Sequence, residues 1–151
     1  MATTVTAATL TVTIQESITL NNLERGSKNV LSIASINEVD NRVMSVPITE
    51  VTVATLGTAV AGGQFIRTDM KYLRVTNLDA ANFVRLRISR ASATKGTVDF
   101  KLEAGKSFVL CHCDFFAQAA DAAFSAFTDI ETIKAQADTL PVDIEVFTAN
   151  A

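Results

Sequence analysis

The stretch Thr9-Leu10-Thr11-Val12-Thr13-Ile14-Gln15 alternates polar and aliphatic side chains at every second position. In an extended strand, this period places the aliphatic side chains on one face and the threonines on the other. Glu16 falls on the aliphatic side of the strand and interrupts the alternation, which continues at Ile18 and Leu20. We therefore expect a bend or bulge at Glu16. The pattern is typical of an antiparallel strand with one covered face and one wet face.

Similar alternation recurs to the end of the chain, and turn-forming residues separate the runs at intervals of roughly 8–12 residues. We therefore predict an all-β protein, an antiparallel β-sandwich that is jelly-roll-like. It is expected to form a single domain over residues 1–151, with an extended N-terminal segment 1–8. Further strands are expected at 30–35, 43–46, 51–56, 72–77, 83–89, 98–103, 107–113, 129–135 and 142–147, with polar connections at 21–27, 37–41 and 57–63.

One stretch departs from the strand pattern. Phe116, Ala120, Ala123 and Phe127 recur with helical spacing inside an alanine-rich run. Two interpretations remain open for this stretch, a short helix near 116–126 or a long loop between strands.

The composition is apolar for a chain without a membrane-spanning run. Hydrophobic residues make up 48% and charged residues 19% of the 151 residues. No apolar run approaches the ~18 residues that a spanning helix needs, and the first residues do not have the pattern of a signal peptide. We expect synthesis in a reducing cytoplasm, no membrane partner, and extra apolar surface that is buried against further copies of the chain.

The charge distribution argues against bulk binding of nucleic acid, which favours basic domains. The net charge is −3. Residues 66–101 hold 8 basic and 3 acidic groups, whereas residues 102–151 hold 2 basic and 8 acidic groups. These blocks are either solvated faces or surfaces that meet one another, within a subunit or across an interface.

Motifs that could support catalysis or cofactor binding are missing. In the run Cys111-His112-Cys113, the two cysteines share one face of a strand and the histidine points to the other, so three metal ligands cannot converge. The glycines form neither a phosphate loop nor a dinucleotide fingerprint. We expect no metal, no cofactor and no enzymatic activity, and we interpret both cysteines as small buried apolar residues.

A hairpin is predicted from residues 72–77 and 83–89, which flank a short polar turn. In that register Arg74 faces Arg87, with Arg85 and an exposed Tyr72 on the same side. The other, core-facing side carries Leu73, Val75, Leu86 and Ile88. Because opposed like charges are destabilising, an anionic group is expected over the two arginines. The candidates are the acidic C-terminal strands, an acidic neighbouring subunit and nucleic acid. Carboxylates are favoured, since one tyrosine and no tryptophan make a poor base-stacking surface.

A second hairpin is predicted from 98–103 and 107–113, across Ala104-Gly105. The latter strand is apolar on both sides, which indicates burial on both sides. Either the 115–127 segment or another subunit is expected to cover its Phe108 face. The candidate interface residues are Phe108, Leu110, His112, Tyr72, Arg74, Arg85 and Arg87.

Several framework stretches resemble small virion structural proteins of tailed bacteriophages, including marine ones. They are residues 13–21 (TIQESITLN), 72–79 (YLRVTNLD), 135–138 (AQAD) and 143–147 (DIEVF). The resemblance implies a virion location, a β-sandwich or jelly-roll fold, no active site, and a homotrimer that decorates and cements the capsid. Its implied partners are the chain itself and the major capsid protein or tail proteins.

Two alternatives keep the sandwich fold. The first is a tail or fibre-head structural component. The second belongs to another class, a carbohydrate-binding β-sandwich, although the lack of tryptophan and the single tyrosine count against it because sugar faces usually need aromatic platforms.

Overall fold

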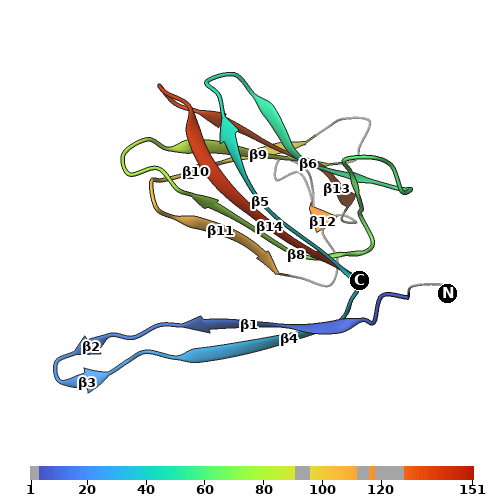
Figure 1. Cartoon of the computed structure of the whole chain (residues 1–151). Coiled ribbons are helices and arrows are strands. Elements are labelled where there is room, and N and C mark those ends of the chain that lie inside the picture. The colour runs from blue at the N-terminus through green and yellow to red at the C-terminus, as the bar shows by residue number, and fades with distance from the viewer. Residues whose placement is uncertain (1–3, 91–95, 112–115, 118–127) are drawn as a thin grey trace.

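The computed structural model describes residues 4–90, 96–111, 116–117 and 128–151, and every regular element in these ranges is a strand. Figure 1 shows a two-layered body and a long two-stranded arm. The all-β, sandwich-type fold predicted from the alternation is confirmed. The arm strands are β1 (Ala8–Gln15), β2 (Thr19–Leu20), β3 (Leu23–Glu24) and β4 (Lys28–Ile36). The body strands are β5 (Glu38–Val46), β6 (Val51–Gly57), β7 (Phe65–Ile66), β8 (Met70–Asn77), β9 (Val84–Arg90), β10 (Thr97–Leu102), β11 (Ser107–Cys111), β12 (Phe116–Ala117), β13 (Thr128–Ala137) and β14 (Val142–Asn150).

The body is built from nested antiparallel pairs. Strand β5 pairs with β14, β6 with β13, β8 with β11, and β9 with β10. This nesting is a long hairpin of four strand pairs rolled into two sheets, with orders β11-β8-β14-β5 and β10-β9-β13-β6-β7. The arrangement is that of a jelly roll, in which most successive strands lie in opposite sheets.

Both predicted hairpins are therefore wrong. Strands β8 and β9 lie in different sheets, so Arg74 does not face Arg87. Strands β10 and β11 are also separated, since β10 pairs with β9 and β11 with β8. A short loop can join strand ends across the ~10 Å between packed sheets as readily as within one sheet.

The core lies between the two sheets and consists of the inward side chains of both. The two-residue period predicted this for Leu73 and Val75 on β8 and for Leu86 and Ile88 on β9, all of which are buried in one cluster. Since their sheets face one another, the correct faces are buried even though the strand partners differ from the prediction. The other large, fully buried side chains of the body are Val46, Val53, Leu56, Met70, Val84, Ile133, Val142, Ile144 and Val146.

The arm leaves the body as one antiparallel ribbon. Strands β1 and β4 pair over most of their length, and Leu20 lies opposite Leu23 at the tip. Between the two leucines, Asn21 and Asn22 have φ angles of 52° and 62°, as a two-residue hairpin turn requires. The regular strand stops before Glu16, since β1 ends at Gln15, but the register shift of the β1–β4 pair lies between Ala8 and Leu10 and not at the expected bulge.

Other expectations need correction. Residues 37–41, predicted as a polar connection, belong mostly to β5, and the 21–27 loop contains β3. The two described residues of the predicted 116–126 helix form β12 instead, and 118–127 lie outside the described residues. In the described ranges, no helix is long and apolar enough to cross a membrane.

Candidate assembly surface

The two faces of the arm differ in chemistry. The register sets Leu10 opposite Ile33 and Val12 opposite Leu31, while Ile14 follows Val12 on the same face. This apolar face contrasts with the opposite one, which carries mainly hydroxyl side chains. The hydroxyl-rich face is formed by Thr11, Thr13, Ser32 and Val30.

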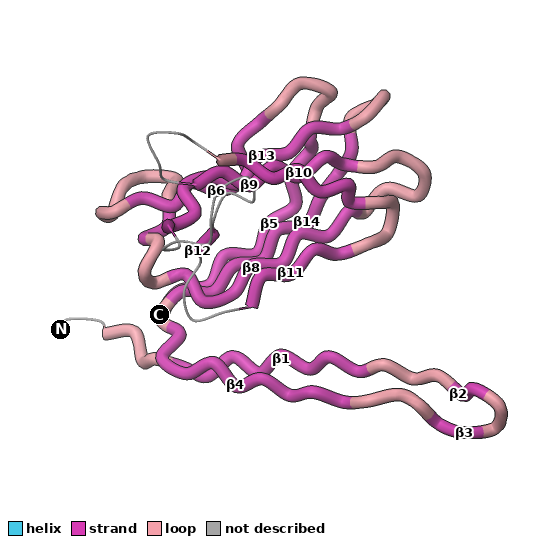
Figure 2. Tube along the Cα trace, turned by 180° about the vertical axis from the view of Figure 1, so that it is seen from behind, coloured by secondary structure: helices cyan, strands magenta, loops and turns pink. Residues whose placement is uncertain are grey.

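The body covers the apolar face only at the root of the arm, which is the end near Ile36 where the arm joins the body. Near the root, Leu10, Val12 and Ile33 pack against a small cluster of buried residues. The cluster comprises Ile36 at the end of β4, Tyr72 on β8 and Ala149 on β14. Farther out, Ile14 is 49% and Leu31 is 39% exposed. At the root, the apolar face points toward the outer side of the four-stranded sheet. Figures 1 and 2 show the arm running away from its root.

A cavity of about 530 Å³ lies between the arm and the body. Leu31 and Ile33 line it from the arm, and Lys71, Cys111 and Ala151 line it from the body. The predicted burial of Cys111 holds in part, because Cys111 is half-buried beside the root cluster. The space is therefore bounded by apolar arm residues on one side and the edge of the sheet on the other.

The tip of the arm is apolar yet well ordered by hydrogen bonds. Ile18, Leu20 and Leu23 are each more than half exposed. The Glu24 carboxylate accepts hydrogen bonds from the backbone N–H groups of Gly26 at 2.8 Å and Ile18 at 3.2 Å. These bonds, led by that from Gly26, lower the pKa of Glu24. Because Glu24 remains charged, it holds the turn in one shape and keeps the leucines presented to solvent.

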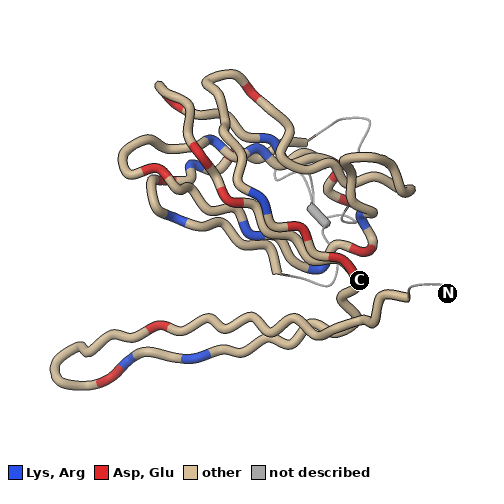
Figure 3. The backbone as a smooth tube through the Cα atoms, in the orientation of Figure 1, with Lys and Arg blue, Asp and Glu red and all other residues tan. Residues whose placement is uncertain are grey.

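Charge is scarce along most of the arm, as Figure 3 shows. Residues 4–15 and 29–37 contain no Lys, Arg, Asp or Glu. The arm's charges lie toward the tip, at Glu16, Glu24, Arg25 and Lys28. An uncharged, partly apolar projection can bury surface against another molecule without desolvating ions.

The sequence-predicted arginines occupy opposite outer faces of the sandwich. Arg74 donates to Glu145 at 2.7 Å on the four-stranded sheet. On the other sheet, Arg87 donates to Asp99 at 2.7 and 2.8 Å and to Glu50 at 2.9 Å. The prediction of carboxylate partners is confirmed within one chain, and for Arg74 the partner comes from the acidic C-terminal third. Arg85 lies in the same network as Arg87, within 3.9 Å of both Glu50 and Asp99.

Tyr72 is not the exposed residue that we predicted. Its ring is buried under the arm root and meets Phe147 edge-on, with ring centroids 5.8 Å apart. Burial raises the pKa of its phenol. Tyr72 is thus part of the joint between arm and body, a role that strand alternation alone could not reveal.

The predicted Phe108 interface face points the other way. Phe108 and Leu110 pack against the central core, and Phe108 also contacts Phe100 with ring centroids 5.0 Å apart. The outward residue of this strand is Val109. His112 lies outside the described residues.

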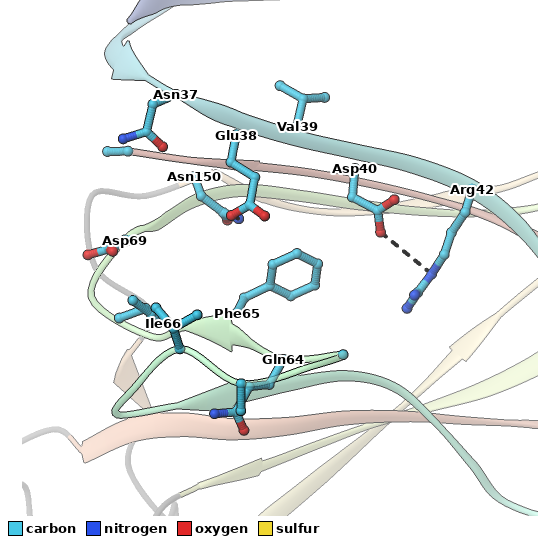
Figure 4. A pocket seen from close by; sticks show the side chains of 14 residues that line it. Asn37, Glu38, Val39, Asp40, Arg42, Gln64, Phe65, Ile66, Asp69 and Asn150 are labelled. Atoms are coloured by element: carbon cyan, nitrogen blue, oxygen red, sulfur yellow. Dashed lines mark hydrogen bonds and ion pairs between the residues drawn. The ribbon is translucent and has the colours of Figure 1, made fainter. Parts of the chain in front are cut away.

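A second cavity, of about 590 Å³, opens between β5 and the loop before β7 (Figure 4). Its lining combines the Phe65 ring with Glu38, Asp40 and Arg42. Asn150 donates from Nδ2 to Glu38 at 2.8 Å, while its buried Oδ1 has no hydrogen-bond partner. This mixture of acceptors, donors and one ring suits a neutral polar ligand.

Across the described ranges, no group of three or more His, Cys, Asp and Glu residues is placed to hold a metal ion. Comparisons of the chain with protein-family models, curated proteins and solved structures find no match.

Proposed function

We propose that this protein is a structural assembly protein, and specifically a homo-oligomeric virion protein of a tailed bacteriophage that decorates and cements the capsid. The observation that carries the proposal is the arm, an ordered ribbon whose outer half exposes Ile14, Leu31 and three apolar tip residues. Large exposed apolar surfaces of this kind mark interaction sites. The tip residues are Ile18, Leu20 and Leu23.

The fold supports the proposal by analogy. Jelly rolls are common in viral capsid proteins, although the same architecture also serves lectins and other proteins. The framework stretches that resemble phage virion proteins point in the same direction. A tail or fibre-head position would use the same arm in the same way.

The test is whether the protein is part of a particle. Particles purified from the source by two density gradients should contain this chain in a fixed ratio to the major capsid protein, measured by quantitative mass spectrometry. Immunogold labelling should then mark capsids rather than tails. Absence of the chain from purified particles would refute the virion proposal.

The cavity at Phe65 favours a second candidate function, carbohydrate binding. Neutral sugars present hydroxyl donors and acceptors beside apolar ring faces, and the lining offers partners for each. Glycan-array binding that is lost in Asp40→Asn and Phe65→Ala, but kept in Val109→Ala on a different face, would support it. No binding to any glycan at millimolar concentration would exclude it.

A further inference from the structure

The arm lacks the packing that a two-stranded ribbon normally needs. An isolated hairpin is marginally stable in water, whereas three or more strands with a shared apolar face are stable. Beyond the root, Ile14 and Leu31 have their apolar side open. A second layer of strands over this face would supply the missing packing.

The same apolar face of a second copy of the chain can provide that second layer. Its central residues are uncharged, and two identical faces related by a two-fold axis are self-complementary. We infer that two copies of the chain associate by stacking their arms, apolar face on apolar face. This inference rests on the proposed assembly function and specifies its partner as a second copy.

The direction in which the apolar face of the arm points determines where the partner arm lies. Because each apolar face points toward its own four-stranded sheet, the partner arm must enter the space between arm and sheet, where the 530 Å³ cavity lies. The hydroxyl face of the entering arm then meets the outer face of the sheet. That face offers Arg74, Thr76 and Ser107, which already form a hydrogen-bonded row with Glu145.

The arm is large enough for such a pair. Thirteen residues from β1 to the turn span about 40 Å, and two strands are about 10 Å wide. Leu10 and Val12 at the root are already covered, so about 23 Å of this length is free. The apolar face, the hydroxyl-rich face and the facing area of the sheet would together bury roughly 700 Å² per copy, which is close to a standard protein interface. A two-fold arm contact favours a dimer over the trimer that the resemblance implies.

Light scattering after size-exclusion chromatography tests the contact on the full chain. The wild type should have twice the 16.1 kDa chain mass at high micromolar concentration. Ile14→Lys with Leu31→Lys should reduce it to the single-chain mass. The matched control is Ile48→Lys with Leu140→Lys, two large exposed apolar residues in loops of the body, and it should keep the wild-type mass.

Three results would overturn the inference: a monomeric wild type, a mass near three chains, or an equal loss of mass in the control pair. Thermal melting checks that the sandwich is intact, and the milder pair Ile14→Thr with Leu31→Thr replaces the lysine pair if that pair does not fold. The particle test of the proposed function does not depend on these masses. A chain found in particles but monomeric in solution would refute only the arm stacking.

Discussion

Arg74 on β8 and Glu145 on β14 form a 2.7 Å ion pair on the outer face of the four-stranded sheet, although 71 positions separate them in the sequence. Both side chains are about three-quarters buried. The hydrogen bond from Arg74 lowers the pKa of Glu145. The pair links two neighbouring strands of one sheet that belong to different strand pairs of the nested hairpin, β8 with β11 and β14 with β5.

Charge reversal tests this pair. Arg74→Glu and Glu145→Arg should each lower the melting temperature, because each places like charges side by side. The double variant restores opposite charges and should recover most of the loss. A double variant no more stable than the sum of the single losses would contradict the pairing.

Acid should weaken the fold through the carboxylates of the other sheet. The hydrogen bond from Arg87 lowers the pKa of Asp99, and that from Lys134 lowers the pKa of Glu50. Since these folded-state values lie below the ordinary ones, the unfolded chain takes up protons first as the pH falls. The stabilisation is therefore complete above about pH 4.5 and is lost as the pH falls through the folded values.

Urea titrations from pH 7 to pH 3 measure this dependence. Glu50→Gln with Asp99→Asn should flatten the decline in the free energy of unfolding. Glu103→Gln with Asp143→Asn makes the same change in net charge and serves as the control. An unchanged slope in the first pair would show that these carboxylates do not govern acid stability.

Asn77 should be the most sensitive polar residue of the body. It is fully buried, its Nδ2 donates to the carbonyls of Asn82 and Leu102, and its Oδ1 accepts from the N–H of Asp79. Asn77→Ala leaves these backbone groups without partners and should cost about 2–4 kcal/mol of unfolding free energy. Chemical denaturation measures it, with exposed Ser45→Ala as the control; a loss below 1 kcal/mol would contradict the assignment.

Neighbouring positions on β11 should respond oppositely to a charge. Leu110 packs against the core, so Leu110→Arg should give insoluble or unfolded protein. Val109 is 40% exposed and lies opposite Arg74, so Val109→Glu should fold with a nearly unchanged melting temperature. Soluble yield and thermal melting compare the two. The reverse outcome would place the sequence-predicted interface back on the Phe108 face.

The order of the arm tip should depend on Glu24. Glu24→Ala removes the acceptor for the N–H groups of Ile18 and Gly26, so both amides should exchange hydrogen faster. Arg25→Ala, at the adjacent position, is the control. Unchanged exchange in Glu24→Ala would mean that the Asn21–Asn22 turn orders the tip alone.

Strand positions and faces could be predicted from the sequence, because side-chain alternation is a local property. Leu73 and Leu86 illustrate this, since both were assigned correctly to the core. Strand partners could not be predicted, because the rolled hairpin joins segments far apart in sequence. The sequence contains nothing local that distinguishes a turn within a sheet from a crossing between sheets.

The candidate assembly surface could likewise be predicted only in part. The alternation in β1 predicted one covered apolar face and one wet face. The arm instead carries most of the apolar face away from the core, anchored through Tyr72 and Ile36. Tyr72 was expected to be exposed because it lies on the outer face of its sheet, and the alternation gives no sign that the arm covers that face.

The antiparallel pairing of the arm makes its length independent of the body. Two residues added to each strand beyond the root would preserve the alternation and move the Asn21–Asn22 turn outward by roughly 7 Å. No core residue would shift, because the added positions lie beyond Tyr72 and its neighbours. Paired insertions in the two arm strands would therefore change how far the protein reaches while the jelly roll stays the same.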